Sequence, residues 1–281
     1  MYYQSISPIV RMGMPLLLAV ILCTSCEKKT TGTGHPEDPE KAASFIPEEN
    51  KKYMYTIEND GGSGGTAMQY ISGSRDSSGI AVYNLHTVIE ASGTSMTTDN
   101  NLFTLAGKTC TEIKVPDAWY QYVALFDQMP NIKVTKTEVF GYPAYMTMEN
   151  TLKDGSIVTT DGPLQQGQRI EFTNNGVPCF MLQEILQVAG TAKVETVTVP
   201  AGSFVCNRFS YEVNTKITVK NGATQETANG NEKITIWMSH GIGMVKQQSA
   251  ASLVSLVPLP TGEIKKIVTN TASTTTLQKI E

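Results

Sequence analysis

A serine flanked by glycines is the first feature of this chain that could carry out chemistry. The stretch 61–65 reads GGSGG and matches the G-x-S-x-G pattern that surrounds the nucleophilic serine of many hydrolases. In those enzymes the serine sits on a tight turn between a strand and a helix. Here the residues after Gly65 alternate like a strand. The pattern therefore predicts a flexible hairpin loop and does not favour a hydrolase site.

Cysteine and histidine side chains are the second chemical candidates. Cys206 and His240 could meet in space as a nucleophile and its base, but Cys206 lies in a strand pattern, where a buried thiol is normally inert. His35 and His86 have no histidine or cysteine at the spacing of metal ligands. The carboxylates are scattered, without the facing pair that a glycosidase needs. We therefore expect no enzyme activity, no metal and no cofactor.

The cysteine near the N-terminus is the third candidate, and it points to location. Leu16–Cys23 is an apolar run behind the single basic residue Arg11. The run is too short for a bilayer span, which needs roughly 20 residues, and it suits a secretory signal peptide. The small residues Thr24 and Ser25 then precede Cys26.

This order resembles the lipobox of bacterial lipoproteins, which implies cleavage after residue 25 and acylation of Cys26. The sequence departs from the lipobox pattern at Cys23, where leucine is usual. The alternative is an ordinary cleaved signal peptide with an incidental cysteine. Acyl chains contribute about 0.8 kcal/mol per buried CH₂, so two or three chains would anchor the protein stably.

Composition and order predict three regions. A lipoprotein signal peptide covers 1–25, a flexible polar tether covers 26–44, and a single β-rich domain covers 45–281. The net charge of −4 and the lack of a basic stretch with interleaved aromatics argue against a nucleic-acid partner. We expect a lipid-anchored protein of the cell envelope, in the outer membrane. The sequence leaves open whether the protein lies on the periplasmic face or on the outer face of that membrane.

The other cysteines are Cys110, Cys179 and Cys206, an odd number that cannot pair fully within one chain. At most one disulfide can form, and any pair is open. Because each lies in or beside an apolar strand pattern, we expect buried free thiols.

Alternation of apolar and polar residues dominates the domain. It is clear in 51–58, 80–90, 108–115, 195–213 and 233–239. Gly, Asn and Asp clusters such as NDGGSGG, TNNG and ANGN separate many of these stretches, and such residues tolerate the positive φ of tight turns. Short strands punctuated in this way predict an antiparallel sheet.

One segment has helical spacing. In 116–129 the apolar residues Trp119, Tyr122, Val123, Phe126 and Met129 recur on one face. Pro116 fits the first helical turn, and Pro130 ends the helix. The predicted fold is mainly β (α+β), a curved antiparallel sheet or half-barrel wrapped around this one helix.

The second half of the chain carries a resemblance. The stretches YPAYMTMENTLKDGSIV (142–158), VETVTVPAGSFVCNRFSYEV (194–213), ITIWMSHGIGMVKQQS (234–249) and TGEIKKIVTNTASTTTLQKI (261–280) resemble the TapB-like secreted and lipoprotein β-proteins of Bacteroidetes, within the broad LolA-like half-barrel class. The sequence departs from that pattern at Glu149 and His240. The resemblance implies no catalytic residue. It implies a concave apolar face that can hold a lipid or another hydrophobic ligand.

Two functions follow as expectations. The first is a non-enzymatic binding or accessory module, held to the membrane by its N-terminal lipid, with an apolar cavity whose candidate lining is Trp119, Phe126, Met129 and Trp237. The second is a structural or interaction scaffold lipoprotein with no ligand pocket. A fully packed interior would favour the scaffold, and an open apolar one would favour ligand binding.

Overall fold

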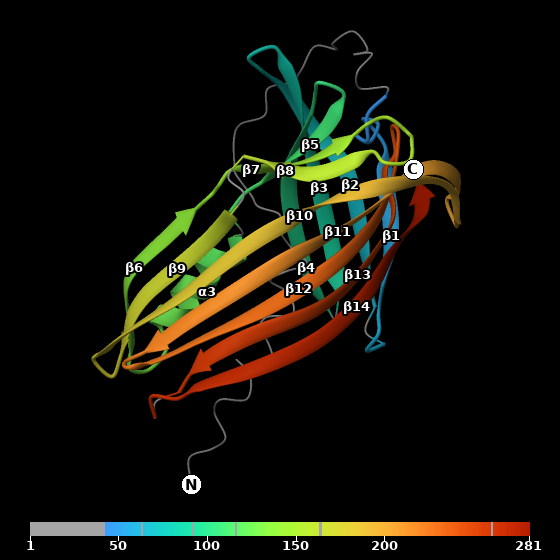
Figure 1. Cartoon of the computed structure of the whole chain (residues 1–281). Coiled ribbons are helices and arrows are strands. Elements are labelled where there is room, and N and C mark those ends of the chain that lie inside the picture. Colours follow the sequence, from blue (N-terminus) through green and yellow to red (C-terminus); the bar gives the residue numbers. More distant parts are fainter. Residues whose placement is uncertain (1–42, 63, 92, 116, 163–164, 260) are drawn as a thin grey trace.

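The computed structural model describes residues 43–62, 64–91, 93–115, 117–162, 165–259 and 261–281. These residues form fourteen strands in one antiparallel sheet and the helix α3 (Figure 1). The elements are β1(Lys52–Asn59), β2(Gly65–Ser77), β3(Ile80–Ala91), β4(Thr94–Leu105), β5(Lys108–Ile113), α3(Asp117–Asp127), β6(Ile132–Phe140), β7(Ala144–Glu149), β8(Ile157–Asp161), β9(Gln165–Asn174), β10(Val177–Val199), β11(Gly202–Asn221), β12(Thr224–Ser239), β13(Gly243–Pro258) and β14(Ile264–Ile280).

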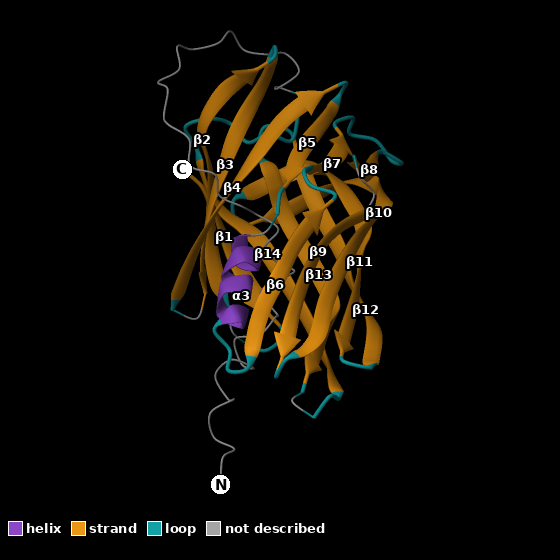
Figure 2. Ribbon diagram, turned by 90° about the vertical axis from the view of Figure 1, so that its left-hand side faces the viewer, coloured by secondary structure: helices purple, strands orange, loops and turns teal. Residues whose placement is uncertain are grey.

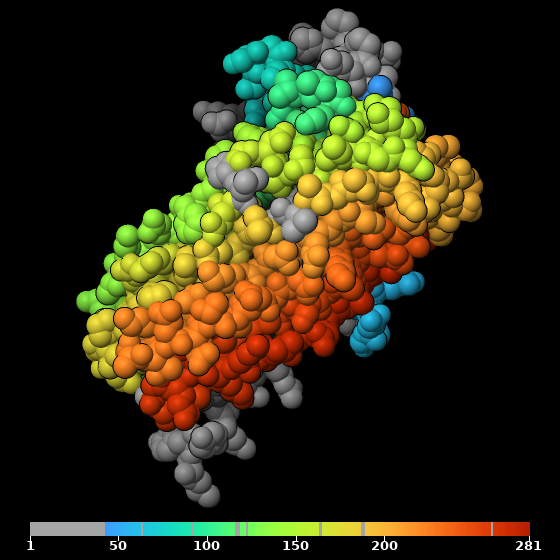
Figure 3. All heavy atoms as spheres, in the orientation of Figure 1, coloured from blue at the N-terminus to red at the C-terminus, as the bar shows by residue number. Residues whose placement is uncertain are grey.

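The sheet closes on itself. Its strand order runs β11-β12-β13-β14-β1-β2-β3-β4-β5-β7-β8-β10, and β10 also pairs with β11, which completes a twelve-stranded barrel. The long strands β10 to β14 form a continuous face, yellow to red in Figure 3. β9 and β6 continue the sheet beyond the ring from one part of β10.

β10 closes the ring by changing neighbours along one of its edges. Residues 177–186 pair with β9, whereas Gly190 and Thr191 pair with β8. Between the two parts, the register with β11 shifts at Val188/Thr191. A Cβ atom on Gly190 would lie 2.0 Å from the carbonyl oxygen of Ser210, so only glycine allows this close approach of the backbones.

Tight turns set the register of several hairpins, as the sequence predicts. Asn175 and Gly176, in the TNNG cluster, have φ values of 51° and 79° and join β9 to β10. Two consecutive residues with positive φ are the signature of the two-residue turns that match the twist of antiparallel strands.

The helix α3 covers the free end of the sheet. β6 is the last strand in the order, and Figure 2 shows α3 standing beside it. At the C-terminal end of the helix, the Asp127 carboxylate accepts a hydrogen bond of 2.7 Å from the backbone N–H of Val134 in β6. An uncovered edge strand would expose a row of unpaired backbone groups, so α3 shields this edge from other chains.

The prediction of a helix over 116–129 is confirmed, because α3 spans 117–127. The mainly β class with one helix is also confirmed. The expected half-barrel wrapped around the helix is not: the sheet closes through the β10–β11 pairing, and α3 packs against the β6–β9 extension. Alternation alone could not reveal closure, because it depends on which distant strands pair.

A segment before β1 fills part of the barrel interior. Ser44 and Ile46 are fully buried, as is nearly all of Phe45. The backbone N–H of Phe45 donates to Thr109 Oγ1, and the N–H of Gly241 donates to the Ser44 carbonyl oxygen. Phe45 packs among buried residues of five strands: Met148, Val158, Ala192, Phe209 and Ile236. Ser44, the last residue of the expected tether, is therefore part of the core. We call residues 44–47 the plug.

Truncating the plug aromatic should destabilise the whole barrel. We expect Phe45→Ala to lower the free energy of unfolding by about 3–5 kcal/mol, because the change leaves a cavity lined by several strands. Leu105→Ala is the matched control, since the Leu105 side chain is 51% exposed, and it should cost less than about 1 kcal/mol. Urea unfolding of the two variants measures both values. Equal effects would show that the plug contributes no more than a surface residue.

Candidate functional site

A band of polar side chains lies on the inward face of β11, β12 and β13. Phe209 and Ile236 are cross-strand partners in the core cluster around Phe45, so their face points inward. Strand residues two apart share a face, which puts Tyr211 and Glu232 on the same inward side. Ser249 joins them, because Tyr211, Ile234 and Ser249 are aligned across the three strands. A carboxylate, a phenol and a hydroxyl therefore meet inside the barrel.

Glu232 is the acidic group of this band. Its side chain is buried, with 7% relative exposure. Burial raises the pKa of Glu232 above its ordinary value of 4.5, and a hydrogen bond with Ser249 opposes that shift. Burial also raises the pKa of Tyr211, and the nearby Glu232 charge adds to the effect. Both groups thus favour their neutral forms more than they would in water.

Several buried oxygen atoms on the same inward surface have no hydrogen-bond partner among the described residues. These atoms are Thr87 Oγ1, Thr98 Oγ1, Gln168 Oε1 and Thr215 Oγ1. Thr87 and Thr98 face each other across β3 and β4, on the side that carries the core residue Tyr83. Because buried polar atoms in proteins are nearly always hydrogen-bonded, these oxygens call for a partner beyond the described residues, such as water or a ligand.

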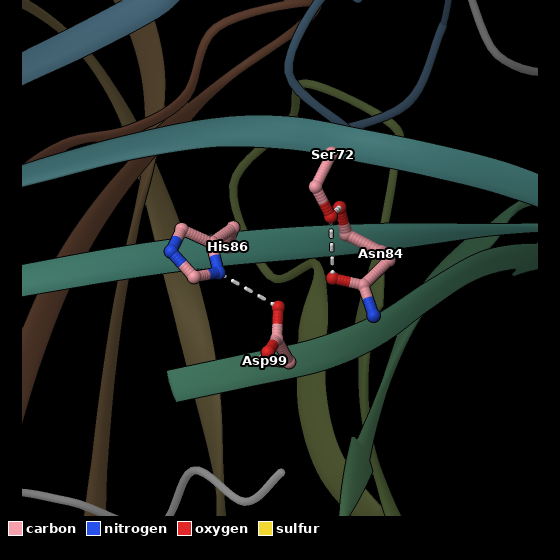
Figure 4. Close-up of polar contacts among 4 residues, drawn as sticks. All are labelled: Ser72, Asn84, His86 and Asp99. Carbon is pink, nitrogen blue, oxygen red and sulfur yellow. Dashed lines mark hydrogen bonds and ion pairs between the residues drawn. The ribbon is translucent and has the colours of Figure 1, made fainter. Parts of the chain in front are cut away.

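A histidine–aspartate pair lies on the opposite face of β3. His86 Nδ1 and Asp99 Oδ1 are 2.9 Å apart, and the Tyr70 ring lies 5.1 Å from the imidazole (Figure 4). Ser72 bonds to Asn84, 2.9 Å away, and Figure 4 shows it well away from the second ring nitrogen of His86. The pair therefore orients the imidazole but presents no serine nucleophile to it. His86 and Leu85 are successive residues of β3, so their side chains lie on opposite faces of the sheet.

Three of the four expected cavity-lining residues come together. Trp119 and Phe126 are buried in α3, and Met129 follows the helix. They pack against Ile170 and other residues of the β6–β9–β10 extension, with Phe126 edge-on to Phe172 at 4.7 Å between ring centroids. This cluster joins the helix to the sheet.

Trp237 lies in a different cluster. It packs with Tyr53, Tyr55 and Leu277 beneath the end of the β10–β11 hairpin. Its indole N–H donates to Glu195 Oε1 at 2.6 Å, and Lys246 Nζ lies 5.2 Å from the ring centroid. The structure therefore does not bring Trp237 to the residues of α3.

The cysteines are buried free thiols, as the strand patterns predict. Cys110, Cys179 and Cys206 form no disulfide. Burial raises the pKa of Cys206 to about 12, so it is not a thiolate at neutral pH. His240 is engaged elsewhere: its Nε2 lies 2.6 Å from the Asn150 carbonyl oxygen, and its ring lies 5.2 Å from that of Phe45.

Other predictions fall outside the described residues. They concern the acylated Cys26, the signal peptide over 1–25, most of the tether including His35, and Ser63 of the glycine-rich loop. The described ends of that loop join β1 to β2, so it connects two strands and not a strand to a helix. In the described ranges, no group of three histidine, cysteine, aspartate or glutamate residues could hold a metal ion. Within those same ranges, no helix is long and apolar enough to cross a bilayer.

The burial of Glu232 on the inward face of β12 is not among the predictions from the sequence. A signal was present, because Glu232, Ile234, Ile236 and Met238 occupy one alternating row and Lys233, Thr235 and Trp237 the other. A glutamate in the more apolar row is a candidate for burial. Tyr211 and Ser249 carry no such signal alone, since their proximity depends on the register of three strands.

Comparison with known families places the chain in one of them. The DUF3108-like family matches residues 53–251, well over half of the chain. The chain belongs to the DUF3108-like family. The match starts in β1 and ends within β13, so it includes the band of Tyr211, Glu232 and Ser249. No curated protein matches the chain.

Two solved structures are similar to this DUF3108-like chain. A predicted exported protein with a YmcC-like fold from Bacteroides fragilis is 16% identical, with a TM-score of 0.45, covering 85% of this chain and 99% of its own. A predicted lipoprotein from Parabacteroides distasonis is 15% identical, with a TM-score of 0.43, covering 85% of this chain and 98% of its own.

Removing the inward charge should change how stability depends on pH. With the pKa of Glu232 raised, the folded state binds the proton more tightly than the unfolded state, so wild-type stability falls as pH rises above the unfolded value of 4.5. Glu232→Gln cannot ionise, so it should gain stability relative to wild type between about pH 4 and pH 8. Urea unfolding across this range measures the difference.

The exposed Glu226, on the same strand, gives the matched control Glu226→Gln. Its difference from wild type should change less with pH. If the Glu232→Gln difference is as flat as that of the control, burial does not penalise the Glu232 charge.

Proposed function

We propose that this DUF3108-like protein is an exported, non-enzymatic binding protein that is anchored by lipid at Cys26 to the outer membrane of the cell envelope. It holds an amphiphilic ligand inside the closed sheet. The observation that carries the proposal is the set of buried inward oxygens without partners at Thr87, Thr98, Gln168 and Thr215.

The arrangement of polar and apolar groups supports an amphiphile. Apolar clusters flank the polar band: the plug residue Phe45 with Phe209 on one side, and Ile217 with Ala228 on the other. A ligand with a polar head and an apolar body would satisfy the oxygens and replace apolar contacts at once. An amphiphilic ligand agrees with the hydrophobic ligand that the resemblance to TapB-like and LolA-like proteins implies. The relationship to those two groups is itself part of the proposal.

A scaffold lipoprotein without a ligand is the second candidate. It is favoured by the outer face of α3, where Tyr120 is 57% and Leu125 is 65% exposed. Exposed apolar side chains on a covering helix would suit contact with another envelope component.

Native mass spectrometry of the full chain, purified from its own host, separates the two candidates. We expect a bound mass beyond the acylated chain that is released when the protein unfolds. Because the plug closes part of the interior, Phe45→Ala should lower the occupancy, while Leu105→Ala should retain it. A wild-type protein that carries no bound mass would overturn the binding function and support the scaffold.

The anchor has its own test. Labelled palmitate should be incorporated into the wild-type chain and into Cys23→Ala, but not into Cys26→Ala, because cleavage after residue 25 removes Cys23 and leaves Cys26 as the first residue. Equal labelling of Cys26→Ala would place the acylated thiol elsewhere.

A further inference from the structure

The buried carboxylate of Glu232 has no counter-ion among the residues that the structure describes. Among the described residues, no lysine, arginine or histidine forms an ion pair with it. The nearest basic residue in sequence, Lys233, points to the opposite face of β12 because successive strand residues alternate. Two cations of β11 form ion pairs elsewhere: Lys216 with Glu184 at 3.1 Å and Arg208 with Glu195 at 3.3 Å. A buried carboxylate without a cation is costly unless something outside the chain pairs with it.

Oxygen atoms surround the Glu232 side chain. Thr215 is opposite Gly230 in β12 and therefore diagonal to Glu232, and its buried hydroxyl oxygen has no partner. Tyr211 and Ser249 are diagonal on the other side, and the Ser249 hydroxyl bonds to the carboxylate. A Cβ atom on Gly230 would lie 2.8 Å from the Ser252 carbonyl oxygen, so the backbone of β13 closely approaches β12 beside Glu232.

A further buried acceptor lies on β9, two strands beyond β11, where the sheet continues past the ring. Gln168, on β9, is 1% exposed, and its amide nitrogen donates to the Tyr142 hydroxyl. Its carbonyl oxygen is left without a donor. Carboxylate, carbonyl and hydroxyl oxygens complement a group that carries several N–H donors and a positive charge.

We propose that the bound amphiphile carries an ammonium or another protonated amine as its head group, and that this group pairs with the Glu232 carboxylate and with the oxygens of Thr215 and Tyr211. This inference rests on the proposed binding function and adds the chemical class of the head group. The apolar body of the ligand then lies along the Ile217 side or the Phe45 side of the barrel.

The test uses the full acylated chain from its own host. Native mass spectrometry gives the occupancy of the bound molecule, and treatment of the extracted molecule with the N-hydroxysuccinimide ester of acetic acid, which reacts selectively with amines, reports a primary or secondary amine as an added acetyl group. We expect acetylation of the ligand from the wild-type protein. In Glu232→Gln we expect the occupancy to fall by a factor of about ten, because losing one partner of a buried charge pair is costly. Glu226→Gln, on the same strand but exposed, should keep the wild-type occupancy.

The outcomes separate the inference from the function on which it rests. A bound molecule that takes no acetyl group, or equal occupancy in wild type and Glu232→Gln, overturns the amine inference and leaves the binding function standing. An empty wild-type protein overturns both. If urea titrations show that Glu232→Gln does not fold, Glu232→Asp is the second variant. It keeps the carboxylate but moves it one CH₂ group closer to the backbone. Its occupancy should then fall below that of Glu226→Gln, and an unchanged value would also overturn the inference.

Discussion

The pairing of β10 with β11 is the constraint on which the rest of this structure depends. It runs from Cys179–Asn221 to Val199–Gly202 and converts an open sheet into a ring. Without it, β11 would be a long free edge, and the inward faces of β11 and β12 would have nothing across from them. Closure lets Phe45, Val158 and Phe209 share one core, although they lie far apart in the chain. A change that weakens this pairing would therefore act on the plug and on the polar band together.

Closure through β10 leaves one strand edge without a partner strand, the outer edge of β6. Because β10 is longer than its partners on one side, it supports β9 and β6 as well as β8, and the sheet ends at β6. The helix α3 covers that end, and its Asp127 carboxylate accepts a hydrogen bond from the backbone N–H of Val134. The helix has Trp119 and Phe126 on its inner side for the same reason, since it must adhere to the sheet whose edge it protects. Helix and closure are thus two consequences of one long strand.

Local features of this fold could be predicted from the sequence, and long-range ones could not. The helical spacing around Phe126 and the turn at Asn175–Gly176 are set by neighbouring residues, and both predictions are confirmed. Closure depends on a choice between partners that alternation does not encode, so Gly190 reads only as a glycine in a strand until Ser210 is known to lie against it. The site divides in the same way: the position of Glu232 in an apolar row was visible, but its neighbours Tyr211 and Ser249 depend on register.

The polar band is the part of the structure that stability alone does not explain. Replacing a buried polar or charged group by a well-packed apolar one is often neutral or stabilising, so a barrel selected only to fold would carry an apolar residue in place of Glu232. Ile234, Ile236 and Met238 on the same row show that the strand accepts such residues there. The diagonal Thr215 oxygen adds to the cost, because it too has no partner among the described residues. A buried group that lowers the free energy of unfolding in the empty barrel, and that pairs with a ligand when one is bound, couples ligand binding to folding stability.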